Sequence, residues 1–172
     1  LIRREQFNLN NISVQQVVTN SPLSAGYKLP EYDHETANNS IDGYDNNQNG
    51  LRDDFEVFVI MDNKPEFHQL GLQAGQLFQQ ILSLRNKQVS ATTRQEAADL
   101  LNKSVYLRMC VAKLNQQDPT FVGFQHRYIN TVDRVRAYRE AQRILRFHLG
   151  DSYMPISQTE PCTSFNQQMS RL

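Results

Sequence analysis

The chain has 172 residues, of which 39% are hydrophobic and 21% charged, and these values fit one globular domain with an ordinary hydrophobic core. Its formal net charge is zero, which excludes a global field that would attract nucleic acid or an anionic membrane. The sequence contains no apolar run near the roughly 18–20 residues that cross a bilayer, so we expect no transmembrane segment.

The first 50 residues carry little helical signal. Residues 11–18, NISVQQVV, fit a short strand, and from residue 20 to residue 50 prolines and glycines interrupt a polar sequence that is typical of loops. A segment of this length without regular structure is unusual inside a compact domain. We therefore expect it to wrap over a helical body or to carry function.

Helical patterns dominate from residue 53 onward. A first helix is predicted over residues 53–62, because carboxylates suit its start and a proline follows its end. A second is predicted over residues 66–87, where two glycines four residues apart favour close packing against another helix. A third is predicted over residues 93–115, because Thr93 and Glu96 form a capping-box pattern at its start.

The last predicted helix starts at Pro119, with Asp118 as its N-cap, and ends at Gly150, with a bend or break near Gly123 or Asn130. Apolar residues at helical spacing are expected to form its inward face: Val132, Val135, Tyr138, Leu145 and Leu149.

These elements predict a mainly α fold, with about four helices packed as an irregular bundle and a long N-terminal loop segment. We expect residues 1–172 to form a single domain, in which residues 1–50 wrap around a helical body formed by residues 53–150. The C-terminal tail, residues 151–172, is expected to lie across the surface.

Two cysteines, Cys110 and Cys162, are the only direct indication of the compartment. An even count fits one disulfide, which is typical of exported proteins, whereas two separate buried thiols are the alternative. We favour the disulfide, which would fix the tail to the third helix. The chain begins with Leu1 and has no charged segment followed by an apolar core, so we expect the export signal to be absent from this chain.

The stretch YDNNQNGLRDDFE, residues 44–56, has the spacing of a twelve-residue calcium loop when it is numbered from Asp45. Alternate side chains converge on one point, Gly50 allows a sharp turn there, and the final glutamate can contribute two oxygens. An all-oxygen site of this kind favours Ca²⁺ over Mg²⁺ or zinc. The predicted ligands are Asp45, Asn47, Asn49, the Leu51 carbonyl, Asp53 and Glu56. A metal-free polar turn is the alternative.

The loop resembles those of EF-hand proteins, and its ninth position, an aspartate, makes it similar to the calcium loops of thrombospondin type 3 repeats. It departs from paired EF-hands, because no amphipathic helix precedes Asp45, Arg52 replaces an apolar residue, and no second loop follows. The wider stretch LPEYDHETANNSIDGYDNNQNGLRDDFE resembles a group of exported bacterial proteins without assigned function. This resemblance, over residues 29–60, implies export and calcium and indicates no reaction. The departures from paired EF-hands favour a structural role for the calcium ion.

The charges of the chain are unevenly distributed. Eight acidic residues and one arginine lie between Glu31 and Glu56, whereas six arginines and two acidic residues lie between Arg127 and Arg146. Four arginines of the basic region fall on one face of the last helix: Arg136, Arg139, Arg143 and Arg146. Such a face can engage phosphate, acidic peptide or acidic glycan, although a solvated face or pairing with the acidic first third is the commoner arrangement.

The sequence shows neither the ligand spacing of a transition-metal site nor a known catalytic motif. We therefore expect an exported, non-catalytic calcium-binding module, located in the periplasm, in the envelope or outside the cell. Its expected partner is an unknown protein or envelope component and not a nucleic acid. The alternatives are an envelope-associated hydrolase with calcium near its cleft, and an assembly subunit that uses the arginine face.

Overall fold

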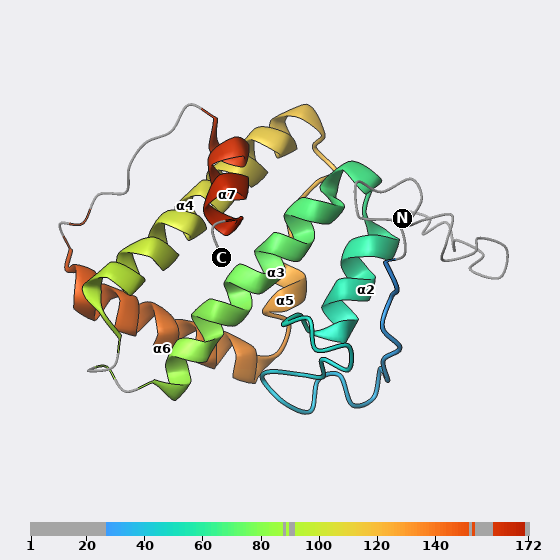
Figure 1. The fold of residues 1–172 in the computed structure, drawn as a ribbon, viewed down its shortest axis with the longest axis horizontal. Coiled ribbons are helices and arrows are strands. Elements are labelled where there is room, and N and C mark those ends of the chain that lie inside the picture. Colours follow the sequence, from blue (N-terminus) through green and yellow to red (C-terminus); the bar gives the residue numbers. More distant parts are fainter. Residues whose placement is uncertain (1–26, 88, 90–91, 152, 154–159, 171–172) are drawn as a thin grey trace, which may run out of the picture.

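The structure is a computed structural model, and it describes residues 27–87, 89, 92–151, 153 and 160–170. In these residues the chain forms six α-helices, two short 3₁₀ helices and no strand (Figure 1). The mainly α fold is therefore confirmed, with more helices than the four expected.

The helices follow one another with short connections. In chain order they are α2 (Asp53–Asp62), η1 (Pro65–Phe67), α3 (His68–Ser83), η2 (Leu84–Asn86), α4 (Arg94–Gln117), α5 (Gln125–Tyr128), α6 (Val132–Leu149) and α7 (Pro161–Met169). The first predicted helix corresponds to α2, the second to α3 with a 3₁₀ turn at each end, and the third to α4. The strand predicted over residues 11–18 lies outside the described residues.

The long helix α3 lies in the middle of the molecule and contacts α2, α4, α6 and α7 (Figure 1). Its glycines allow α2 to approach closely. A Cβ atom at Gly71 would lie 2.6 Å from Val59, and one at Gly75 would lie 2.6 Å from Phe55, so neither position has room for a side chain. The predicted role of these glycines in close helix packing is confirmed.

The chain between α4 and α6 differs from the prediction. No helix begins at Pro119, because Asp118 is the C-cap of α4 and its N–H donates to the Leu114 carbonyl at 2.8 Å. Gly123 then adopts a left-handed backbone with φ of 78°, which a continuing right-handed helix does not allow. The predicted break is present, because α5 ends at Tyr128 and α6 starts at Val132.

The inward face of α6 is also rotated from the predicted one. Its buried side chains are Arg134, Ala137, Ala141, Ile144, Leu145 and Leu149. Val132 and Val135 are instead 66% and 36% exposed, so their predicted place in the core is wrong. Arg134 lies inside because its guanidinium donates hydrogen bonds to carbonyls of the N-terminal segment. The small side chains of Ala137 and Ala141 allow close packing on the same side of the helix.

The N-terminal wrap is present over residues 27–52, which run beside α2 and then turn beneath it (Figure 1). Tyr27, Leu29 and Ile41 of this segment pack against the hydrophobic core. This segment, called the N-terminal loop below, brings the predicted calcium loop to the start of α2.

The C-terminal tail is fixed by the predicted disulfide between Cys110 and Cys162. The expectation that it only crosses the surface is wrong, because residues 161–169 form α7, which packs on α4 and buries Phe165 and Met169.

None of the helices in the described part of the chain has the length and apolar character needed to span a bilayer.

Candidate metal centre

The predicted calcium loop forms a tight turn that leads directly into α2. Gln48 and Gly50 adopt left-handed backbone conformations, with φ of 56° and 79°, so the chain reverses over a few residues. The carboxylate of Asp45 closes the turn from the inside, because it accepts the N–H groups of Asn49 at 3.0 Å and Gly50 at 2.8 Å. The predicted first ligand therefore also shapes the loop.

Glu56 lies on α2 and reaches back to the loop, where it is fully buried. Its Oε2 accepts the side-chain N–H groups of Asn47 at 3.2 Å and Asn49 at 2.9 Å, and its Oε1 accepts the Tyr27 hydroxyl. Rotation of each asparagine amide by half a turn would present its oxygen at the same place. The structure thus brings three predicted ligands together: Asn47, Asn49 and Glu56. In the structure the two amide groups donate to the carboxylate, and after rotation their oxygens could face an ion instead.

Tyr27 reinforces this arrangement. Burial raises the pKa of the Tyr27 hydroxyl, and the hydrogen bond to Glu56 and the charge of Glu56 raise it further. The hydroxyl therefore remains a proton donor to the carboxylate at neutral pH. This contact was not predicted from the sequence, because 29 positions separate the two residues.

Asp53 occupies the first position of α2 and is also fully buried. Its carboxylate accepts the Asn46 N–H, at 3.2 Å to Oδ1 and 3.0 Å to Oδ2, and does not share the amides that surround Glu56. Burial raises the pKa of Asp53, against the lowering effect of the Asn46 N–H, and the charges of Asp45 and Asp54 raise it further. The buried Asp53 carboxylate therefore lies close to two further negative charges, which a bound cation would offset.

Leu51 anchors the loop to the bundle through its buried side chain, which lies where a Cβ atom at Gly75 would reach. Its N–H donates to the Asn49 side-chain oxygen at 2.9 Å. These contacts leave the Leu51 carbonyl as the backbone group at the seventh position of the loop, where a calcium loop uses a carbonyl ligand.

The oxygen donors of this loop are those that a hard cation prefers. Among the described residues, no three side chains of His, Cys, Asp or Glu gather closely enough to hold a metal ion. A cation here would therefore depend on asparagine and carbonyl oxygens as well as carboxylates, which is the donor set of Ca²⁺ and not of zinc.

Neither Asp53 nor Glu56 forms an ion pair with a lysine or arginine in the described part of the chain. Buried carboxylates without a cationic partner are costly, and a bound divalent ion would remove that cost.

Two buried arginines hold the loop in place, and neither was predicted from the sequence to be functional. Arg52, at the eighth loop position, pairs with Asp54 at 2.5 Å and donates to the carbonyls of Tyr128 at 2.9 Å and Arg127 at 3.2 Å. Its guanidinium also lies 4.7 Å from the centre of the Tyr128 ring. The departure of Arg52 from the EF-hand pattern is thus explained, because it joins the calcium loop to α5.

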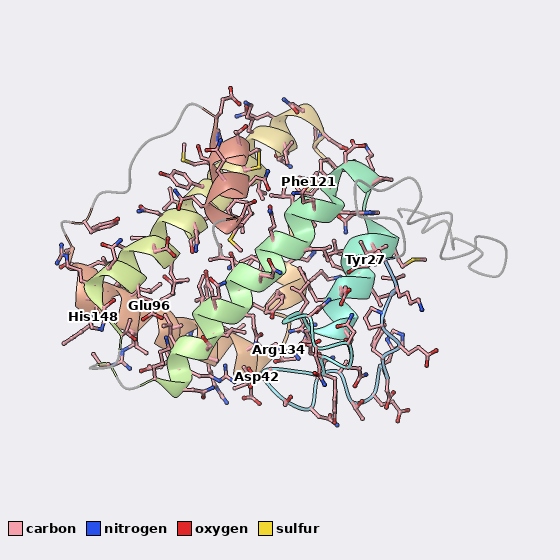
Figure 2. The ribbon with its side chains drawn as sticks, in the orientation of Figure 1. Tyr27, Asp42, Glu96, Phe121, Arg134 and His148 are labelled. Carbon is pink, nitrogen blue, oxygen red and sulfur yellow. A yellow bond between two sulfur atoms is a disulfide. The ribbon has the colours of Figure 1, made fainter. Side chains whose placement is uncertain are left out.

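Arg134 of α6 holds the preceding part of the N-terminal loop, and it lies near Asp42 at the end of the bundle that this loop crosses (Figure 2). Its guanidinium donates to five oxygens at 2.6–3.0 Å, which belong to Ala37, Asn38, Ser40, Ile41 and Asn130. Burial lowers the pKa of Arg134 to about 10, so the group is still charged at neutral pH. Arg52 could have been identified from the sequence, because it is the one arginine in an acidic segment. Arg134 could not, because it lies among five other arginines.

Of the two commoner arrangements, a solvated face and pairing with the acidic first third, the described residues show the solvated face. All four arginines of that face are exposed. Arg136 pairs with Asp133 at 3.4 Å and Arg143 with Glu140 at 2.8 Å, both on α6 itself.

A cavity of about 530 Å³ opens beside the calcium loop. Four carboxylates and two tyrosines are among its lining side chains: Glu31, Asp33, Asp53, Asp54, Tyr32 and Tyr44. The hydrolase alternative requires a cavity in this position, and that alternative stays a prediction.

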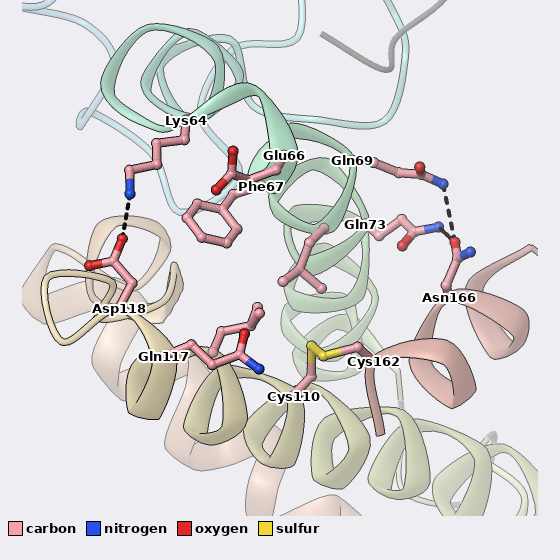
Figure 3. A pocket seen from close by; sticks show the side chains of 12 residues that line it. Lys64, Glu66, Phe67, Gln69, Gln73, Cys110, Gln117, Asp118, Cys162 and Asn166 are labelled. Carbon is pink, nitrogen blue, oxygen red and sulfur yellow. Dashed lines mark hydrogen bonds and ion pairs between the residues drawn. A yellow bond between two sulfur atoms is a disulfide. The ribbon is translucent and has the colours of Figure 1, made fainter. Parts of the chain in front are cut away.

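A second cavity, of about 610 Å³, lies between the start of α3, the end of α4 and α7, and shares no residue with the calcium loop (Figure 3). Lys64 and Asp118 pair at 2.6 Å on one side of it. Asn166 accepts hydrogen bonds from Gln69 and Gln73 on the other, and the disulfide lies between these two sides. These polar groups are paired with one another, and none of them belongs to the predicted ligand set. The cavity therefore contributes no ligand to the candidate metal centre.

Comparisons with protein-family models, with curated proteins and with solved structures found no match for this chain. The resemblance of residues 29–60 to exported bacterial proteins therefore stays a prediction.

Proposed function

We propose that this chain is an exported calcium-binding protein, in which one Ca²⁺ ion fastens the calcium loop to the start of α2. The protein acts as a non-catalytic module that binds a protein or an envelope component. The observation that supports the calcium site most strongly is the burial of Asp53 and Glu56 without a cationic partner in the described residues. The disulfide supports export in a weaker way.

The ion would be held by oxygens of Asp45, Asn47, Asn49, Leu51 and Glu56, with Asp53 as a direct or water-mediated ligand. It would supply positive charge to the buried carboxylates and would cross-link the turn to α2. Three carboxylates with two neutral amides fit a dissociation constant on the order of 10⁻⁶–10⁻³ M.

A structural role is favoured over a regulatory one. Residues 34–42, which precede the loop, form turns and bends, so the described chain has no helix that could swing open as in a paired EF-hand. Through Arg52 the loop is joined to α5, and through Arg134 the preceding segment is joined to α6. A bound ion would therefore stabilise the junction of three helices.

Calorimetric titration of chelator-treated protein with Ca²⁺ tests this proposal. We expect one binding event for the wild type, and its loss in the Asp45→Ala and Glu56→Ala variants. Glu35→Gln is the matched control, because it removes an exposed carboxylate from the same acidic segment and should bind as the wild type does. Absence of binding by the wild type at about 5 mM Ca²⁺, above the expected dissociation constants, would refute the calcium site.

A further inference from the structure

The side of α6 that faces away from the bundle combines arginines with exposed apolar side chains. Its four arginines, Arg136, Arg139, Arg143 and Arg146, are all exposed. Val132, Val135 and Phe147 are 66%, 36% and 73% exposed, and they are three of the six large apolar side chains found exposed in the described residues. At about 100° per residue these seven side chains fall within about 120° of the helix circumference. We call this surface the outer face of α6.

The outer face keeps a net positive charge although the whole chain is neutral. Asp133 and Glu140 are the acidic residues of α6. At about 100° per residue, both fall beside one edge of the outer face. Their contacts with Arg136 and Arg143 are exposed ion pairs, which are weak in water. Arg139 and Arg146 form no ion pair within the described part of the chain.

The order of side chains along the outer face indicates the kind of partner. The two valines lie in the first turn of α6 and Phe147 in its last, so the apolar groups stand about 20 Å apart at the ends, with the arginines mostly between them. A protein interface has the opposite arrangement, with apolar anchors at its centre and charges at its rim. A lipid surface accepts this order, because guanidinium groups pair with phosphates at the headgroup level while apolar side chains at the ends reach the acyl boundary.

We propose that the outer face of α6 docks the protein onto an anionic lipid surface. This inference specifies the partner of the interaction module proposed above, and it rests on α6 and not on the calcium loop. Arg134 leaves the opposite side of the same helix to hold the N-terminal loop, so docking does not use the residues of the calcium loop. Because the net charge of the chain is zero, the attraction is local to this face. Salt at physiological concentration limits its range to about one Debye length, roughly 8–10 Å.

Sedimentation of the full chain with lipid vesicles tests the proposal. The vesicles contain either phosphatidylcholine alone or phosphatidylcholine with about 30% phosphatidylglycerol, an anionic headgroup. We expect binding to the anionic vesicles only, and its loss at about 0.5 M salt, where exposed charges are screened. The Arg139→Glu/Arg143→Glu variant should lower partitioning at least about 25-fold, since each arginine near such a surface contributes about fivefold.

The matched control is Arg108→Glu/Lys113→Glu, which makes the same change in net charge at exposed or half-buried positions of α4 and should bind nearly as well as the wild type. Phe147→Ser should weaken vesicle binding without changing the net charge. Circular dichroism verifies that each variant is folded. All assays are run in chelator, so failure of the lipid proposal is distinguishable from failure of the calcium site.

Two results would overturn lipid docking. One is wild-type binding to anionic vesicles that the Arg139→Glu/Arg143→Glu variant retains. The other is no binding of the wild type to the anionic vesicles. Binding to soluble polyglutamate that Phe147→Ser does not change would then identify an acidic polypeptide as the partner.

Discussion

At the scale of single residues, Arg134 carries the attachment of the N-terminal loop to the helices. Its guanidinium is fully buried and donates to five oxygens, three of which are backbone carbonyls of residues 37–41. Those carbonyls belong to a segment without regular structure, so no backbone N–H of a helix can replace the guanidinium as their hydrogen-bond donor. Loss of the guanidinium would leave several buried acceptors unsatisfied at once.

We therefore expect Arg134→Met, which keeps most of the side-chain length, to lower the free energy of unfolding by about 3–5 kcal/mol. Urea denaturation followed by circular dichroism measures this loss. Arg136→Met is the matched control on the exposed side of α6, and it should change stability by no more than about 0.5 kcal/mol. Equal stability of the two variants would contradict the role assigned to Arg134.

At the scale of elements, local sequence signals set the helix ends well. Thr93 caps α4, because its side-chain oxygen accepts the Glu96 N–H at 3.1 Å. The reciprocal half of the predicted capping box is replaced by an ion pair, since the Glu96 carboxylate lies 2.5 Å from the Lys87 ammonium. Gly150 ends α6 in a left-handed conformation with φ of 69°. These interactions span at most a few residues, except where a distant partner such as Lys87 competes.

The helix α7 was not predicted, and its position depends on a distant partner. Its sequence shows a proline at the start and few apolar residues, so only contact with α4 and α3 makes it stable. The disulfide joins residues that are 52 positions apart and fixes α7 on α4.

Removal of this disulfide is expected to destabilise the protein and to release α7 first. The chain-entropy model gives a loss of up to about 4 kcal/mol for a closed loop of this length. Hydrogen exchange of a Cys110→Ala/Cys162→Ala variant should show α7 amides losing protection before those of α3. The same variant provides its own control, because a reductant should change the wild type but not the variant. Unchanged α7 protection would contradict this assignment.

At the scale of the whole molecule, the acidic and basic parts of the chain remain separate. The calcium loop and its adjoining carboxylates lie around α2, whereas the outer face of α6 carries the exposed arginines. The calcium loop and the segment before it are joined to α5 and α6 through the buried Arg52 and Arg134, and one exposed ion pair, Arg127–Asp62 at 3.4 Å, adds a contact between α5 and α2. An ion bound in the calcium loop would therefore act on the stability of the entire bundle.

We expect the melting temperature to rise with calcium. At free Ca²⁺ about 100 times the dissociation constant, a bound ion stabilises the folded state by about 2.7 kcal/mol. For a chain of this size that corresponds to roughly 5–10 °C. Thermal unfolding in chelator, in Ca²⁺ and in Mg²⁺ measures the effect. Mg²⁺ should give the smaller shift because it requires a stricter octahedral site, and equal melting temperatures in Ca²⁺ and chelator would contradict the prediction.

The geometry of the candidate site was partly readable from the sequence, because much of it is local. The spacing of Asp45, Asn47, Asn49 and Glu56 places their side chains around one turn, and the structure links them there by hydrogen bonds. The hydrogen bonds that Asp53 makes, to the Asn46 N–H, were not readable in this way. They depend on how α2 is oriented against the N-terminal loop.

The sequence by itself determined the helical character of the chain, the start and end of α2, the start of α4, the end of α6 and the spacing of the predicted calcium loop. Each of these depends on capping, proline or glycine geometry, or side-chain direction within a few neighbouring residues. Tertiary structure alone decided which side of α6 is buried and that Asp53 and Glu56 lose contact with water. It also placed Arg134 among carbonyls that lie more than 90 positions away. These outcomes depend on contacts between distant segments, which form only when the helices pack together.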